Sequence, residues 1–235
     1  MNSTIKASIA LVISIVLVHA LYIGYIRPDA DLAMQAALES GQSAPRELTV
    51  ILKDYEQEIC LILMFWGFFL IGSRCLEIVR NRYIFDVDLL EESNGSITDL
   101  GTALEKLESL PHKVRDTPLI LALMSSLRRY LITKNVQDTS DAIESSIDAL
   151  SVKQEAQNSM IRYLIWAIPS IGFIGTVRGI GQALSQADQA LEGNISGMTN
   201  SLGVAFNSTL VALLISIGLM FLLHQLQRLK DSLLV

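Results

Sequence analysis

Two threonines, Thr176 and Thr209, lie in stretches of the sequence that contain no charged residue. A hydroxyl group donates and accepts hydrogen bonds without adding charge, so such residues could bind water, an ion or a carboxylate inside an apolar medium. A threonine in a membrane helix more often bonds to the backbone of its own helix. The spacing of the two residues leaves both interpretations open.

Ionisable side chains are scarce in the same stretches. No Asp or Glu lies in the four charge-free cores, so a proton relay there would need a carboxylate from another chain. His19 and His224 are the only titratable candidates. A structural role is expected for both, although His224 shares the helical face of Thr209 and could contact exiting protons.

Arg178 interrupts the third apolar stretch near its expected outer end. At about 100° per residue it falls opposite the small residues of that stretch. We expect it to face a neighbouring helix or the lipid headgroups and to pair with Asp188 or Glu192. The alternative is a charge at the rim that gates the access of ions.

Small residues form one narrow stripe on each of the last two apolar stretches. The first stripe contains Pro169, Gly172, Gly175, Thr176, Gly179 and Ala183, and the second contains Ala205, Thr209, Ala212, Ser216 and Met220. Small stripes let membrane helices approach closely. By themselves they predict tight helix packing or oligomerisation.

The composition indicates a membrane protein. Charged residues make up 18% of the chain, against about 25% in an average soluble domain. The net charge of −6 argues against a nucleic-acid partner, which would need a basic surface. The sequence contains no metal-ligand spacing, phosphate-binding loop or nucleophile elbow, so we expect neither an enzyme nor a metal site.

Four apolar stretches approach the length of about 20 residues that a membrane-spanning helix needs. Basic residues concentrate in the segments between the second and third stretches, which places both termini in the cytoplasm. The expected membrane helices are 1–26, 59–79, 161–184 and 202–224. The expected connections are a periplasmic segment at 27–58, a cytoplasmic helical domain at 80–160, a periplasmic turn at 185–201 and a cytoplasmic tail at 225–235.

The predicted fold is therefore an all-α integral membrane protein with four transmembrane helices. Helical spacing of apolar residues continues from Asp138 into the third apolar stretch without Gly or Pro. We expect a long third helix that extends from the membrane into the cytoplasm.

The order of residues in the last two stretches resembles the MotA/TolQ/ExbB proton-channel family. The pattern is Pro169-x-x-Gly172-x-x-Gly175-Thr176-Val177-x-Gly179, followed about 30 residues later by Ala205-Phe206-x-x-Thr209. The resemblance implies a homopentamer in the lipid bilayer of the inner membrane, with the last two spans around a central pore. It also implies a dimeric single-span partner, similar to ExbD, TolR or MotB, that threads the pore and carries the proton-binding Asp.

The resemblance assigns roles to particular residues. Thr176 and Thr209 match the pore threonines of the family, and Pro169 matches its kink proline. Ala205, Ala212 and Ser216 would line the ion pathway with them, and Gly172, Gly175 and Gly179 would allow close packing. The sequence departs from the family at Arg178, where many members have a bulky apolar residue, and at Ala212, where glycine is frequent.

The implied function is an ion-driven motor that transports H⁺ or Na⁺ without a cofactor. Flagellar rotation, outer-membrane transport, gliding, envelope maintenance and defence all remain open as the driven process. One alternative is a helical scaffold or sensor that relays a periplasmic signal without conducting ions. The other is a self-contained ion channel, which the lack of an internal carboxylate disfavours.

Overall fold

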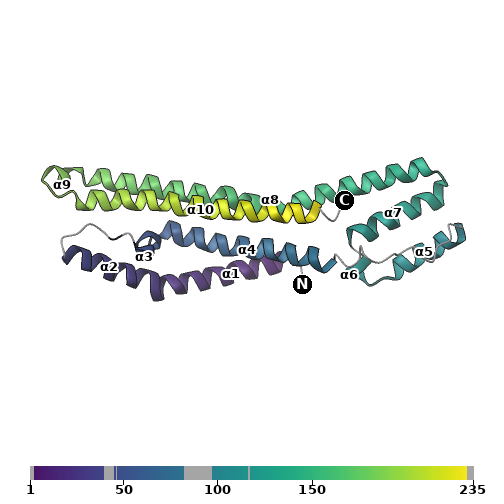
Figure 1. The fold of residues 1–235 in the computed structure, drawn as a ribbon, viewed down its shortest axis with the longest axis horizontal. Helices are drawn as coiled ribbons and strands as arrows, with labels where there is room; N and C mark the ends of the chain where they lie inside the picture. The colour runs from purple at the N-terminus through teal and green to yellow at the C-terminus, as the bar shows by residue number, and fades with distance from the viewer. Residues whose placement is uncertain (1–2, 40–44, 46, 82–96, 116, 232–235) are drawn as a thin grey trace. The chain divides into compact units, whose positions relative to one another are not determined.

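The computed structural model describes residues 3–39, 45, 47–81, 97–115 and 117–231. All regular secondary structure in these residues is helical, which confirms the all-α part of the predicted fold (Figure 1). The chain divides into two compact units. One contains Met1–Cys75 and Met160–Val235, and the other contains Leu76–Ser159.

The first unit begins with one long helix that contains a local change of winding. Helix α1 (Ser3–Leu21) continues through a π-helical turn, η1 (Tyr22–Ile26), into α2 (Arg27–Glu39). The apolar stretch predicted at 1–26 is thus the first part of a longer helix. Val18, Tyr22 and Ile26 form the buried face of this helix.

The second long helix starts earlier than its apolar sequence suggests. After the short α3 (Leu48–Leu52), α4 runs over Tyr55–Asn81, whereas the predicted membrane segment begins at residue 59. Its first turn contains Glu56 and Glu58. Negative side chains are favourable at a helix N-terminus, where the backbone N–H groups carry partial positive charge.

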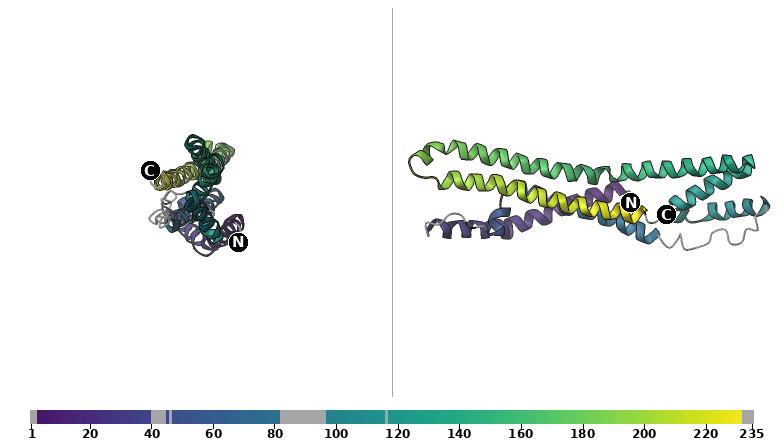
Figure 2. Two further views of the ribbon diagram at one scale, coloured as in Figure 1. Left: turned by 90° about the vertical axis from the view of Figure 1, so that its right-hand side faces the viewer. Right: turned by 45° about the horizontal axis from the view of Figure 1, so that its top comes forward.

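The last long helices form an antiparallel pair. Helix α8 is one continuous element of 50 residues over Val136–Ser185, with Pro169 inside it. A turn that contains the short α9 (Ala187–Leu191) leads to α10 (Ser196–Asp231). The part of α8 after residue 160 runs beside α10 in the views of both Figure 1 and Figure 2.

Within the described residues, four helical segments are long and apolar enough to cross a membrane, as predicted. They are Ile5–Ala37, Tyr55–Val79, Val136–Ser185 and Ser196–Lys230. Each is longer than the predicted membrane segment that it contains or overlaps. The exact limits of the membrane segments and their sidedness stay predictions.

The second unit is a small helical domain. Its further helices are α5 (Ile97–Ser109), α6 (His112–Arg115) and α7 (Pro118–Thr133). Its core contains Leu107, Ile120, Met124 and Leu127. Pro118 suits the first turn of α7 because its missing N–H has no partner there in any case. The helical character predicted for 80–160 is present from residue 97 onward, and residues 82–96 lie outside the described part.

Candidate functional site

Glycines bring α8 and α10 into backbone contact. Gly172 faces Ala212, Gly175 faces Ser208 and Gly179 faces Ala205. A Cβ atom built on these glycines would lie 2.5, 2.6 and 2.8 Å from the Cβ atom of the facing residue, closer than real Cβ atoms approach. The two small-residue stripes therefore meet each other within one chain, and we call this line of contact the α8–α10 seam.

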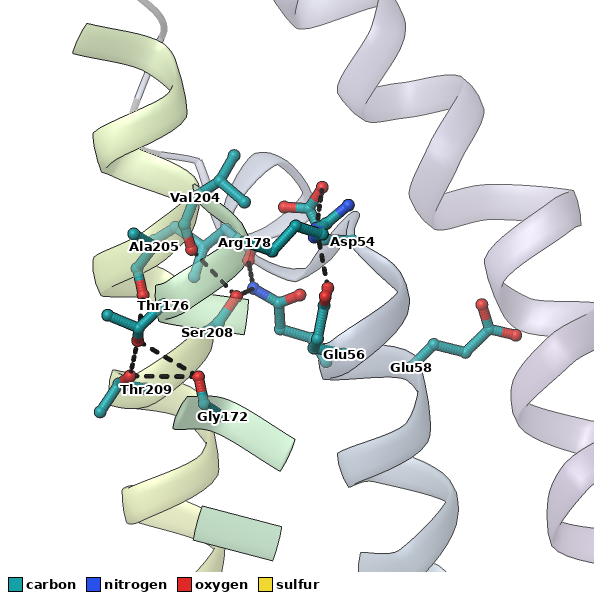
Figure 3. Close-up of polar contacts among 12 residues, drawn as sticks. Asp54, Glu56, Glu58, Gly172, Thr176, Arg178, Val204, Ala205, Ser208 and Thr209 are labelled. Atoms are coloured by element: carbon teal, nitrogen blue, oxygen red, sulfur yellow. Dashed lines mark hydrogen bonds and ion pairs between the residues drawn. The ribbon is translucent and has the colours of Figure 1, made fainter. Parts of the chain in front are cut away.

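Thr176 and Thr209 lie half-buried at one edge of this seam, with their hydroxyls hydrogen-bonded to each other (Figure 3). The Thr176 hydroxyl also lies 3.0 Å from the carbonyl oxygen of Ala205 and 3.2 Å from that of Gly172. The Thr209 hydroxyl lies 3.3 Å from the same Gly172 oxygen. The two hydroxyl protons thus share four possible hydrogen bonds, so the pair can change partners without moving its backbone.

The other residues predicted to line the pathway lie inside the seam. Ala205 and Ala212 are completely buried, and Ser216 is 8% exposed. Thr176 and Thr209 keep a partly exposed surface in the isolated chain. His224 is exposed on α10, about 22 Å along the helix from Thr209 at 1.5 Å per residue.

Pro169 and Ser216 form a matched pair across the seam. A proline inside a helix has no N–H, so the carbonyl four residues earlier, that of Ile165, loses its helical hydrogen bond. The Ser216 hydroxyl donates a 2.8 Å hydrogen bond to that carbonyl oxygen. In a membrane an unsatisfied carbonyl is costly, and a serine on a neighbouring helix is one of the groups that can satisfy it.

Arg178 contacts the neighbouring helix α4, and the partners predicted for it were wrong. It forms a 2.8 Å ion pair with Glu56 of α4 and lies 3.7 Å from a carboxylate oxygen of Asp54. Gly175 makes room for this contact, because a Cβ atom there would lie 3.2 Å from Cγ of Glu56. The early start of α4 brings these acids against α8, whereas Asp188 lies on α9.

Gln57 connects α4 to α10. It is completely buried, and its amide nitrogen lies 3.3 Å from the Ser208 hydroxyl of α10 and 3.1 Å from the Ile51 carbonyl oxygen. Its amide oxygen is buried and, within the described residues, has no hydrogen-bond partner. Ser208 also faces Gly175, and Glu56 lies against the same glycine. The unpaired Gln57 oxygen therefore belongs to the group of residues around Glu56.

Glu58 reaches the remaining helix. One carboxylate oxygen lies 2.6 Å from Nδ1 of His19 on α1, and the other accepts a 2.6 Å bond from Arg27 at the start of α2. Figure 3 shows Glu58 pointing away from Glu56. Successive helical residues point about 100° apart, so Glu56, Gln57 and Glu58 each face a different helix. We call these three residues the α4 triplet.

The α4 triplet was not predicted, because it lies just before the charge-free stretch from which the second membrane segment was inferred. Glu56 and Glu58 are 8% and 6% exposed, so both carboxylates are buried although they lie outside the charge-free core. The available signal was the presence of two acids just before an apolar helix. Such acids favour the first turn of that helix.

Asp54 lies just before α4, and the pKa of its carboxyl group is raised. Burial raises the pKa of its carboxyl group, and the nearby Lys53 and Arg178 oppose that effect only in part. A buried acid of this kind takes up a proton more readily than an exposed one. No group of three or more His, Cys, Asp or Glu residues in the described ranges is placed to hold a metal ion.

One comparison with known proteins gives a match. The sequence model of the MotA/TolQ/ExbB proton channel family matches residues 115–234, just over half of the chain. The matched region contains α8, α10 and the whole seam between them, and it excludes α1 and α4. No curated protein and no solved structure matches the chain.

Proposed function

The chain belongs to the MotA/TolQ/ExbB proton channel family, and we propose that it is the pore-forming subunit of an ion-driven motor in an inner membrane. In this proposal five copies surround a dimer of a single-span partner similar to ExbD, TolR or MotB. Both termini lie in the cytoplasm, and the transported ion is H⁺ or Na⁺. The partner supplies an Asp that binds the ion inside the pore.

The hydrogen-bonded pair of Thr176 and Thr209 is the observation that carries this proposal. The pair presents two hydroxyls at the edge of the seam, and each has alternative acceptors nearby. An incoming carboxylate can replace these acceptors and receive hydrogen bonds from both hydroxyls. Such bonds favour the ionised form of the carboxylate, and protonation then weakens them.

The buried glutamates of this unit already have basic partners. The two buried glutamates of the α4 triplet face basic partners, Glu56 with Arg178 and Glu58 with His19 and Arg27. An acid that already holds a basic partner is a poor carrier of a mobile ion. We therefore infer that the mobile ion needs a carboxylate from another chain.

The proposed work cycle follows from the change in charge of that carboxylate. Each protonation removes a negative charge and changes which of the threonine pairs around the ring holds the partner most firmly. A membrane potential of 100 mV supplies about 2.3 kcal/mol for each charge that crosses. Repeated over the five copies, this free energy can rotate the ring of subunits relative to the partner dimer. His224, near the end of α10, is the proposed exit on the cytoplasmic side.

Valine substitutions test the threonine pair, because valine keeps the shape of threonine and removes the hydroxyl. Thr176→Val and Thr209→Val, each expressed with the partner, should lower ion flux. Loss of a hydrogen bond to a charged group costs about 1.5–3 kcal/mol, which corresponds to roughly tenfold or more in rate. Flux is measured as pH change or Na⁺ uptake in vesicles.

Thr199→Val is the matched control. Thr199 is an exposed threonine of α10 whose hydroxyl bonds to the Ile195 carbonyl of its own helix. Its loss should leave flux unchanged. Unchanged flux in the Thr176 and Thr209 variants, with the complex intact, would remove these two residues from the pathway.

A further inference from the structure

Glu58 is a buried carboxylate that two basic side chains of one helix hold at once. Its side chain is 8% exposed, and each of its oxygens has its own partner. His19 Nδ1 lies 2.6 Å from one oxygen and an Arg27 nitrogen lies 2.6 Å from the other. The contact joins the first long helix to α4, on a different side of α4 from Arg178.

The π-helical turn lies between the two basic residues and places them on the same side. Arg27 follows His19 by eight residues, which in a regular α-helix puts the two side chains about 80° apart around the axis. In η1 the Arg27 N–H instead bonds to the Tyr22 carbonyl, five residues back. This turn takes up one extra residue and reduces the angle to roughly 20°. The irregular winding therefore lets both side chains reach one carboxylate.

Tyr22 provides a second, independent feature at the same place. The residue is completely buried, and its hydroxyl has no hydrogen-bond partner in the part of the chain that the structure describes. The Arg27 guanidinium that holds Glu58 lies 5.7 Å from the centre of the Tyr22 ring and 4.5 Å from that of Tyr55. A buried hydroxyl that can accept or donate a hydrogen bond thus lies near the carboxylate.

The contact between His19 and Glu58 holds one proton between its two facing atoms. Because Nδ1 faces the carboxylate, Nε2 is the ring nitrogen that remains to exchange a proton with the surroundings. In the isolated chain the His19 side chain is 53% exposed, whereas Glu58 is buried, so the histidine is the more accessible of the two partners. A second proton on the ring makes an imidazolium that faces a carboxylate, which is a stronger contact than that of a neutral ring.

We propose that His19, Glu58 and Arg27 form a proton-binding site between α1 and α4, at which the histidine exchanges the proton and its occupancy sets how firmly the two helices are held. The other titratable or charged groups around the site are Tyr22, Asp54, Tyr55, Glu56 and Cys60. Arg178 of α8 pairs with Asp54 and Glu56 and so compensates those two acids. The site goes beyond the proposed motor function, because it needs neither the partner nor the threonine pair.

Proton binding is measured directly on the full-length protein in lipid nanodiscs. The chain has three histidines, so His112→Gln with His224→Gln leaves His19 as the only one. ¹⁵N-histidine NMR at pH 7 then gives the ratio of protonated to neutral His19. In a Glu58→Gln variant this ratio should fall, because the carboxylate that accepts the histidine's hydrogen bond is lost. Glu56→Gln is the matched control and should change the ratio less than twofold.

Helix contact is measured through Trp66, whose indole donates a 3.0 Å hydrogen bond to the Ala7 carbonyl oxygen across the same pair of helices. With Trp166→Phe, Trp66 is the only tryptophan. Its emission should shift to longer wavelength as the pH rises from 5.5 to 8.5 and His19 loses its second proton. His19→Gln, which keeps the contact between Glu58 and Arg27, should abolish this shift.

Two results would overturn the proposal: an unchanged protonation ratio in Glu58→Gln, or the same emission shift in His19→Gln as in the parent. If Glu58→Gln does not fold, the His19→Gln comparison still decides the matter. Neither measurement involves ion flux. A failure here therefore leaves the motor function standing, and unchanged flux in the threonine variants leaves this site standing.

Discussion

Arg178 of α8 and Glu56 of α4 form a 2.8 Å ion pair on the side of α8 that faces away from the threonine pair. The Glu56 side chain is 11% exposed and that of Arg178 is 35% exposed, so the acid is the more completely desolvated partner. A charge that loses its partner in such a place is costly. The pair therefore fixes how α4 packs against α8, and its removal should be visible in stability.

Arg178→Gln should lower the free energy of unfolding by about 3 kcal/mol, because Glu56 keeps its charge in a buried site without a counterion. The double variant Arg178→Gln with Glu56→Gln should recover much of this loss. Unfolding of the purified protein in detergent measures both. An equal loss in the single and double variants would show that the pair itself does not matter. If Arg178 instead gates ion access, the single variant will raise leak through the complex without lowering stability.

Ser216→Ala should lower stability by about 1 kcal/mol, because the Ile165 carbonyl then has no donor. In a Pro169→Ala background the backbone N–H at position 169 is restored and can satisfy the same carbonyl. Ser216→Ala should then have almost no effect. The measurement is a double-mutant cycle on unfolding free energies, and a coupling energy of zero would contradict the pairing.

Gly175→Ala should push α8 and α10 apart, because its Cβ atom would lie 2.6 Å from Cβ of Ser208. Overpacking of this kind costs about 1–3 kcal/mol. Gly181→Ala is the control on the same helix, since a Cβ atom there meets nothing within 4 Å. Gly181→Ala should be neutral or slightly stabilising, because alanine is the better helix former. Equal unfolding free energies for the two variants would mean that the seam is not tightly packed.

The stability of the protein should depend on pH through Asp54. Burial raises the pKa of this acid above its ordinary value of 3.8. For an acid whose pKa is higher in the folded state, the contribution to stability is fully present below the unfolded-state pKa. It is lost as the pH rises through the folded-state pKa. Asp54→Asn should therefore flatten the fall in unfolding free energy as the pH rises above the ordinary pKa of 3.8.

The exposed Asp188 provides the control for this titration, since Asp188→Asn should leave the pH dependence unchanged. Parallel curves for the parent and Asp54→Asn would show that Asp54 does not titrate in this range. Guanidinium-induced unfolding at several pH values gives the required curves.

The features that the sequence predicted correctly depend on local pattern. Apolar length identified the four helices that can span a membrane, and helical spacing placed the small residues around Gly175 on one stripe. These properties follow from the geometry of a single helix and need no knowledge of its neighbours.

The features that the sequence did not predict depend on contacts between distant segments. The partners of Arg178 lie more than a hundred residues earlier in the chain, and nothing in the spacing around Arg178 indicates them. Alignment of His19 with Arg27 needs the π-helical turn, which a regular helical projection excludes. The pattern within any single helix therefore could not predict the proton site on α1 and α4.

Three adjacent side chains of α4 each contact a different long helix. The number of residues in this segment is therefore fixed. An insertion or deletion of one amino acid between positions 54 and 59 would rotate every later side chain by about 100°. The three side chains could then no longer all face their present neighbours. We therefore expect length changes near this point to abolish assembly of the whole unit, whereas α9, at the far end of the hairpin, should accept them.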